Sequence, residues 1–267
     1  MKRLFIIAAA VLTVVAYMHA EGTRIVAHRG HWNAEGSAQN SIRSLVKADS
    51  VGADATEFDV HVTSDGVAVL NHDGVINGYK VIDTPSEIIC AQKLENGENV
   101  ATLRDFLKVA KDLKIDLVLE LKWHGTAERE IEAAKICVDL VNEAGLADRT
   151  QYISFSSTIC NALSQLTDRP VSHLWGEQID PDKAKGLGAT GCDYSNSVWK
   201  EHPEYFKRCK ELGLITNVWT IDDDESIVRA LNDGFDFITT NDPVKAMKLR
   251  AQTINCEPCK SDCCTTK

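Results

Sequence analysis

The sequence has no excess of positive charge. Its 267 residues include 29 lysines and arginines against 39 aspartates and glutamates, which gives a formal net charge of −10. Nucleic acids and anionic lipid surfaces are bound by clustered lysine and arginine side chains. The composition therefore excludes a nucleic-acid-binding protein, and it makes an anionic membrane surface a poor match.

Several sequence features are also missing. No Gly-rich dinucleotide-binding motif follows the first predicted strand, where a nucleotide-binding open sheet requires it. No Pro-rich or Ser-rich linker, and no internal repeat beyond alternating strands and helices, marks a second domain. After the first 20 residues no segment is apolar enough to span a bilayer. These absences predict one domain with no stable membrane insertion.

Residues 1–20 have the pattern of a secretory signal peptide. Lys2 and Arg3 precede an apolar run over residues 4–17, and the small Ala20 offers a cleavage position before Glu21. The run is too short for a transmembrane anchor. The sequence therefore predicts a mature chain that starts near Glu21 and is secreted or periplasmic.

The chain has nine cysteines, a number that export permits because disulfides persist outside the cytoplasm. Four of them crowd residues 251–267, which we interpret as a disordered, Cys-rich C-terminal tail. Cys256 and Cys259 have the spacing of a metal or redox motif, but the adjacent Cys263 and Cys264 do not complete a zinc site. Five other cysteines are expected to be small buried hydrophobic residues: Cys90, Cys137, Cys160, Cys192 and Cys209.

Short β-rich runs alternate with amphipathic helical runs between residues 21 and 250. The predicted strands are residues 24–27, 55–60 (extended by 67–70), 115–120, 151–154, 171–174, 190–193, 215–219 and 235–239. A helix is predicted over residues 126–144, with Ile131, Ala134, Val138 and Val141 on its buried stripe. Successive strand–helix units make parallel strands, so the sequence predicts an α/β fold, a single-domain (β/α)8 TIM barrel. The alternative, a doubly wound open sheet, is disfavoured by the strand count.

Capping residues lie at the ends of the predicted helices, in agreement with the alternation of strands and helices. Four glycines follow helical runs where a left-handed cap is expected: Gly52, Gly145, Gly213 and Gly234. Asp180 and Asp242 each precede a proline, which predicts a capping acid before the first helical residue. The run Thr84-Pro85-Ser86-Glu87 predicts a capping box on a short extra helix.

Polar residues gather at the predicted strand ends, where a barrel of this type has its active site. Glu57 and Asp59 lie two residues apart in the second strand, so both carboxylates project to the same side. Taken alone, this pair fits an exposed edge strand equally well. The pattern recurs at other strand ends, which carry His28, Arg29, His72, Glu120, Lys122 and Trp219.

The residue types at these strand ends suit one kind of chemistry. Three carboxylates without a nearby cysteine favour a hard divalent ion, Ca²⁺ or Mg²⁺, over zinc. Two histidines can serve as acid and base in one reaction, and Arg29 and Lys122 can bind phosphate oxygens. Together these groups predict phosphoryl chemistry on an anionic diester.

A series of ordered motifs resembles the glycerophosphodiester phosphodiesterase family over residues 25 to about 248. In chain order the motifs are His28-Arg29-Gly30, Gln39-Asn40-Ser41, Glu57-Phe58-Asp59-Val60, Thr63-Ser64-Asp65-Gly66, His72-Asp73, Glu120-Leu121-Lys122, Val218-Trp219-Thr220 and the run from Gly234 to Pro243. The set is specific because order and spacing must agree together.

The resemblance implies a (β/α)8 barrel that hydrolyses glycerophosphodiesters to glycerol phosphate and an alcohol. It implies that the substrate's own glycerol hydroxyl attacks, giving a cyclic phosphate that water then opens. The roles it implies are metal binding by Glu57, Asp59 and Glu120, acid–base catalysis by His28 and His72, phosphate binding by Arg29 with added charge from Lys122, and an apolar wall formed by Trp219.

The chain departs from the family at one motif. Ala38-Gln39-Asn40-Ser41 stands where the family carries a run like Pro-Glu-Asn-Thr. Gln39 can still hydrogen-bond to Arg29 but brings no negative charge, so the electrostatics of the phosphate site differ. The segment between His72 and the helix near Asp105 is only about thirty residues, which predicts little lid over the pocket.

Two other functions fit part of this residue pattern. A phospholipase-type phosphodiesterase acting on phosphoinositides or sphingolipids would need an extended apolar rim, and only Trp32 and Trp123 suggest one. A non-catalytic phosphate-ester-binding protein would lack one of the histidines or carboxylates, and all five are present. The sequence specifies neither the alcohol nor the oligomeric state. Three aromatic residues fit either a choline cage or core packing: Trp175, Tyr194 and Trp199.

Overall fold

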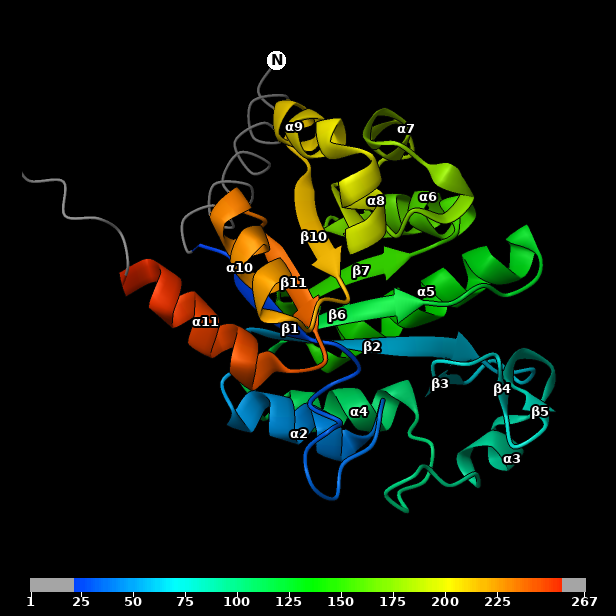
Figure 1. The fold of residues 1–267 in the computed structure, drawn as a ribbon. Helices are drawn as coiled ribbons and strands as arrows, with labels where there is room; N and C mark the ends of the chain where they lie inside the picture. Colours follow the sequence, from blue (N-terminus) through cyan, green and yellow to red (C-terminus); the bar gives the residue numbers. More distant parts are fainter. Residues whose placement is uncertain (1–21, 256–267) are drawn as a thin grey trace, which may run out of the picture.

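The computed structural model describes residues 22–255, and it shows a closed barrel of strands surrounded by helices (Figure 1). The strands are β1 (Arg24–Ala27), β2 (Ala55–Val62), β3 (Ala68–Leu70), β4 (Val75–Ile76), β5 (Tyr79–Lys80), β6 (Asp116–Leu121), β7 (Thr150–Ser154), β8 (Val171–His173), β9 (Gly191–Ser195), β10 (Ile215–Trp219) and β11 (Phe237–Thr240). The helices are α2 (Ile42–Ser50), α3 (Ser86–Cys90), α4 (Leu103–Ala110), α5 (Ala127–Ala144), α6 (Ser157–Leu166), α7 (Pro181–Gly186), α8 (Asn196–Glu201), α9 (Pro203–Leu212), α10 (Asp224–Asp233) and α11 (Pro243–Asn255).

Eight of these strands close the barrel. They run in the order β1, β2, β6, β7, β8, β9, β10, β11, all parallel, and β1 pairs with both β2 and β11. The predicted (β/α)8 barrel is therefore confirmed, with each barrel strand beginning and ending within two residues of its predicted bounds. None of the helices in residues 22–255 combines the length and apolar composition that a membrane crossing requires.

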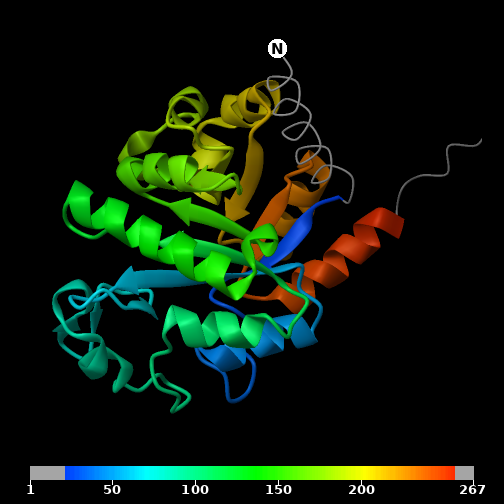
Figure 2. The same ribbon diagram turned by 180° about the vertical axis from the view of Figure 1, so that it is seen from behind.

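Apolar side chains fill both sides of the strands, as parallel sheets covered on both faces require. One cluster inside the barrel is contributed by successive strands, with Val26, Ala55 and Val118 among its members. Two larger clusters lie between the strands and the helices. Seen from behind in Figure 2, α5 and α4 lie along the outside of the barrel, and α11 packs beside β1. The carboxyl ends of the strands are thus held in a rigid ring.

The predicted helix ends are mostly confirmed. Gly145, Gly213 and Gly234 cap their helices in the left-handed conformation, and Gly52 follows α2 with φ +80°. Asp180 accepts a hydrogen bond from the first turn of α7, and Asp242 does the same for α11. The helix α11 continues to Asn255, into the segment predicted as a tail. The predicted signal peptide, residues 1–20, and the four tail cysteines lie outside the described residues.

Two local predictions are wrong. The capping box before α3 does not form, because the Thr84 hydroxyl donates back to the Lys80 carbonyl. The Asp65 carboxylate accepts instead from the Ser86 amide and hydroxyl across the loop. On α5 the predicted Ala134, Val138 and Val141 are buried, but Ile131 is half exposed, and Ala133 and Cys137 complete the buried face instead.

The second unit carries an inserted segment. The Asp65-Gly66 turn leads into β3, which pairs antiparallel with β2 and so returns the chain to the barrel rim. The segment after β3 forms the β4–β5 hairpin and α3 around a small core of its own, made by Val69, Val81, Ile89 and Val100. His72 lies at the start of this segment, so its position depends on the insertion and on β2 together.

Candidate active site

Three carboxylates meet on the inward face of the neighbouring strands β2 and β6. One oxygen each from Glu57, Asp59 and Glu120 lies within 4.8 Å of the others, and all three side chains are buried. In the strand register Asp59 lies beside Glu120, and alternation puts Glu57 on the same inward face. The sequence-predicted convergence of these residues is therefore what the structure shows.

Burial of like charges perturbs all three groups. Burial, together with the charges of Asp59 and Glu120, raises the pKa of Glu57 well above its usual value. Burial and the Asp59 charge raise the pKa of Glu120 to about 7, against the opposing effect of Lys122. Burial acts on Asp59 in the same sense, but the Lys122 charge and hydrogen bonds from Lys122 and Asn40 outweigh it and lower its pKa to about 2. Holding like charges together out of water therefore favours the protonated form of two of the three groups.

Two cations contact this cluster. The Lys122 ammonium lies 2.7 Å from Asp59 Oδ1 and 2.6 Å from Glu120 Oε1. The Arg29 guanidinium lies 3.5 Å from Asp59 Oδ2, and its Nη1 donates to Gln39 Oε1 at 2.6 Å. The predicted Arg29–Gln39 hydrogen bond is confirmed. It orients Arg29 without the extra negative charge that a glutamate would bring.

His28 is held in one tautomer by the last barrel strands. Asp222 accepts from the side-chain NH₂ of Asn241, which turns Asn241 Oδ1 toward His28 Nδ1 at 2.9 Å. His28 therefore carries its proton on Nδ1, and the lone pair of Nε2 faces Glu57 Oε2 at 4.0 Å. Burial lowers the pKa of His28 to about 4. The ring is neutral near pH 7.

His72 has a different environment. Its side chain is 40% exposed, and Nδ1 lies 2.7 Å from the carboxylate of the neighbouring Asp73. Because a carboxylate only accepts, Nδ1 carries a hydrogen there. The backbone carbonyl of His72 lies 3.4 Å from the ring of the buried His61.

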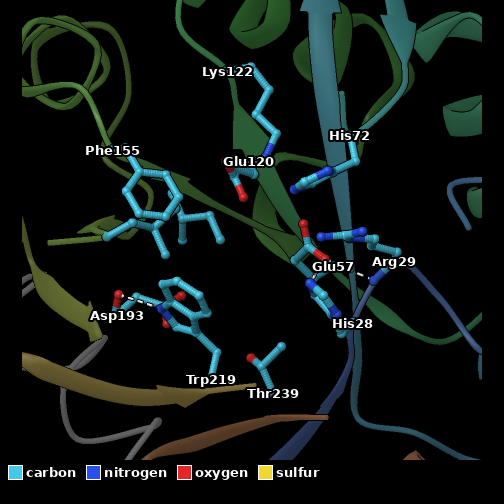
Figure 3. A pocket seen from close by; sticks show the side chains of 12 residues that line it. His28, Arg29, Glu57, His72, Glu120, Lys122, Phe155, Asp193, Trp219 and Thr239 are labelled. Atoms are coloured by element: carbon cyan, nitrogen blue, oxygen red, sulfur yellow. Dashed lines mark hydrogen bonds and ion pairs between the residues drawn. The ribbon is translucent and has the colours of Figure 1, made fainter. Parts of the chain in front are cut away.

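One cavity of about 230 Å³ joins these groups. His28, Arg29, Glu57 and His72 lie on one side in Figure 3, while Phe155, Trp219 and Asp193 lie on the other. The remaining lining residues are Glu120, Lys122, Ile153, Leu174 and Thr239. Every predicted site residue except Asp59 lines this cavity directly, and Asp59 lies behind it in contact with Lys122 and Arg29.

The three aromatic residues weighed as a choline cage pack in the core. Tyr194 and Trp199 are buried and neither lines the cavity; their ring centroids are 5.1 Å apart. Trp175 contacts Tyr194 edge-on at 5.2 Å. The Tyr194 hydroxyl donates to the Ile179 carbonyl, so its polar end is also satisfied within the fold. The packing alternative is confirmed.

Several site residues had no role assigned from sequence. Asn40 donates to Asp59 Oδ2 and accepts from the Asp59 amide, which fixes that carboxylate. Asn40 and Asn241 both fall within motifs that the sequence displays, so a motif-by-motif search finds them. Phe155 and Asp193 fall in no such motif, although Asp193 is a polar residue at the end of the predicted strand 190–193, and the closed barrel brings both to the cavity.

The turn after β1 depends on Gly30. Its φ is +78°, and a Cβ added there would lie 2.3 Å from Ser44 Oγ and 2.8 Å from the Ser44 backbone carbon. Ser44 in turn donates to the Arg29 carbonyl at 3.0 Å. The close approach of this turn to α2 fixes Arg29 at the cavity.

We expect Gly30→Ala to lower the free energy of unfolding by roughly 2–4 kcal/mol, from left-handed strain plus overlap with Ser44. Gly66→Ala is a matched control, because Gly66 has φ +80° and no atom within 4 Å of the added Cβ. It should cost only about 1 kcal/mol. Denaturant unfolding measures both, and equal losses would mean that α2 moves away without cost.

Comparison with known proteins agrees with this geometry. The model of the glycerophosphoryl diester phosphodiesterase family matches residues 28–245. The chain belongs to this family. A glycerophosphodiester phosphodiesterase from Caldanaerobacter subterraneus subsp. tengcongensis is 25% identical over 248 residues, covering 85% of this chain and 97% of that protein. As a member of the family, the protein is an enzyme, a phosphoric diester hydrolase.

A solved structure supports the same membership, and a second one shares the fold. The crystal structure of a glycerophosphodiester phosphodiesterase from Parabacteroides distasonis is 43% identical, with a TM-score of 0.85, covering 87% of this chain and 98% of that one. A phosphodiesterase from Oleispira antarctica, solved with the product sn-glycerol-3-phosphate, has a TM-score of 0.75 at 19% identity, covering 87% of this chain and 98% of that one. The second likeness concerns the fold alone.

Proposed function

We propose that this phosphodiesterase is metal-dependent and hydrolyses glycerophosphodiesters to glycerol phosphate and an alcohol by histidine acid–base catalysis. One observation carries the proposal: two histidines and two cations surround a cavity beside a cluster of three buried carboxylates. Family membership supplies the substrate class. The small cavity suits a compact diester.

The carboxylate cluster fits a divalent cation. Its ligand oxygens lie within 4.8 Å of one another, and Glu57 Oε1 is buried without a hydrogen-bond partner among residues 22–255. Oxygen ligands of this kind suit Ca²⁺ or Mg²⁺. We therefore assign Glu57, Asp59 and Glu120 to hold the ion. Such an ion, when bound, would polarise a phosphate oxygen and stabilise charge that develops there.

We assign His28 as the base. Asn241 fixes the proton on Nδ1, so the Nε2 lone pair is available toward the cavity. Burial lowers the pKa of His28, which keeps the ring neutral near pH 7 and leaves this lone pair free. His28 Nε2 lies beside the carboxylate cluster, where the attacking glycerol hydroxyl of the substrate would lie. His28 thus removes the proton from that hydroxyl as the new P–O bond forms.

We assign His72 as the acid and the cations as the phosphate clamp. Asp73 accepts from His72 Nδ1, which fixes the ring and leaves Nε2 as the atom that gives a proton to the departing alcohol. Arg29 and Lys122 line the cavity and bind the diester oxygens. Trp219 forms the apolar wall that packs against the carbon skeleton.

Product analysis on a panel of glycerophosphodiesters, with and without chelator, tests the function. We expect glycerol phosphate and the free alcohol from glycerophosphocholine and related diesters. Phosphorus NMR identifies the phosphate product. Release of glycerol with phosphocholine would mean that the other P–O bond breaks and would contradict the proposal. So would hydrolysis of phosphoinositides or sphingolipids without any action on the water-soluble diesters.

We also propose that the chain is secreted or periplasmic. The support is the pattern of residues 1–20, with Lys2 and Arg3 ahead of an apolar run. Mass spectrometry of protein from its native host should find a chain that begins near Glu21. An intact Met1 on soluble cytoplasmic protein would contradict export.

A further inference from the structure

One carboxyl group of the cavity has no part in the function proposed above. Asp193 lies on β9, which is the fourth strand from β2 in either direction around the barrel. It therefore faces the carboxylate cluster from directly across the barrel. Asp193 is 2% exposed and lines the cavity on the side of Trp219 (Figure 3).

The two oxygens of Asp193 differ. Oδ2 accepts from Asn217 Nδ2 at 2.9 Å, and Nδ2 of Asn217 also donates to Thr239 Oγ1 at 2.9 Å. Three adjacent strands thus hold the carboxyl group in one orientation. Oδ1 is buried and has no hydrogen-bond partner within residues 22–255. A buried polar atom without a partner is costly, so a ligand group that hydrogen-bonds to Oδ1 would bind favourably here.

The surroundings of Asp193 indicate which kind of ligand. The neighbouring cavity lining is apolar, formed by Ile153, Leu174 and the indole of Trp219. Trp219 is fixed there because its Nε1 donates to the Asp193 backbone carbonyl at 2.8 Å. Burial raises the pKa of Asp193 to about 8. A hydroxyl satisfies Oδ1 in both protonation states, since it accepts from the acid and donates to the carboxylate.

We propose that Asp193 recognises the terminal hydroxyl of the glycerol half of the substrate, an inference that rests on the proposed function. The phosphate binds at Arg29 and Lys122, and the terminal hydroxyl is on the glycerol carbon farthest from it. The closed side of the cavity at Asp193 takes the glycerol, which every substrate shares. The variable alcohol then points to the opposite side of the cavity, where His72, the proposed acid, is 40% exposed (Figure 3).

The test compares kcat/KM for glycerophosphocholine and for the analogue whose terminal CH₂OH is replaced by CH₃. The wild-type enzyme should prefer the parent by about 10- to 100-fold, the effect of one buried hydrogen bond. Asp193→Leu should reduce this preference to about threefold or less, whereas Asp193→Asn keeps the shape and a donor and should retain most of it. Glu130→Gln is a matched control, because Glu130 is buried with an unpartnered oxygen but lies outside the cavity. It should leave the preference unchanged.

Each failure is distinguishable. If the wild-type enzyme hydrolyses neither diester, the proposed function and this inference both fail. If it hydrolyses both with less than a twofold preference, or if Asp193→Leu keeps the preference, the inference is overturned and the function stands. If Asp193→Asn and Asp193→Leu lower kcat/KM equally, and only for choline diesters, then the choline cation binds at Asp193. That result would also overturn the inference. Calorimetric affinities for glycerol 3-phosphate and 1,2-propanediol 1-phosphate should show the same ratio without turnover.

Discussion

His28→Ala is expected to lower turnover by about 10²- to 10⁴-fold, the usual range for loss of a general acid or base. The ring is the neutral acceptor beside the carboxylate cluster, and no other described residue holds an imidazole lone pair at that position. His72→Ala should give a loss of similar size, because each histidine serves a step that the other cannot. Initial rates on glycerophosphocholine measure both.

The double variant makes this prediction sharper. Because the two histidines act in one reaction, removing the second after the first should cost little more. The fold-loss in turnover of the double variant should therefore be far smaller than the product of the two single fold-losses. His202→Ala is a matched control for His72, because its side chain is 36% exposed and lies 3.4 Å from the Glu204 carboxylate, outside the cavity. If His72 only packs its loop, His72→Ala will lower the unfolding temperature and leave turnover within about tenfold. Lys122 would then be the first alternative acid to test.

Chelation is expected to abolish activity, and Ca²⁺ or Mg²⁺ should restore it. Three buried carboxylates repel one another, and burial together with the neighbouring carboxylate charges raises the pKa of Glu57 and Glu120. A divalent ion removes this penalty. It should also stabilise the fold, by about 2.7 kcal/mol at a concentration a hundredfold above its Kd.

Glu120→Gln separates the metal from other effects of chelator. The variant keeps the shape but loses one charge, so it should need far more metal for half-maximal activity and show a smaller thermal shift. Asp139→Asn, an exposed carboxylate on α5, should change neither quantity. Full turnover in excess chelator, with metal-free protein confirmed by elemental analysis, would falsify the metal assignment.

The barrel and the charged half of the site were predictable from sequence for a physical reason. Strand ends carry their polar residues in local patterns, such as Glu57 and Asp59 two residues apart, and barrel closure brings those ends together. The half of the cavity around Asp193 and Trp219 was not predictable in the same way. Asp193, Asn217 and Thr239 meet through the register of three neighbouring strands, which no local pattern specifies.

The failed predictions have a similar origin. Thr84-Pro85-Ser86-Glu87 has the composition of a capping box. The Ser86 amide at the start of the helix instead donates to the carboxylate of Asp65, which lies in a distant turn. Ile131 fits the helical period, yet the buried face of α5 is set by its packing on α6 and the strands. Local propensity was correct about where helices form and wrong where a tertiary contact competed.

The bond between His28 and Asn241 spans 213 residues of chain. During synthesis, β1 emerges from the ribosome long before β11, and until β11 docks one edge of β1 is unpaired. A nascent chain that lacks its last strand has the carboxylates, Arg29 and both histidines, yet nothing fixes the His28 tautomer. Such a chain would contain the site residues without a fixed His28 tautomer, so activity is expected only once β11 and the Asn241 that follows it have docked.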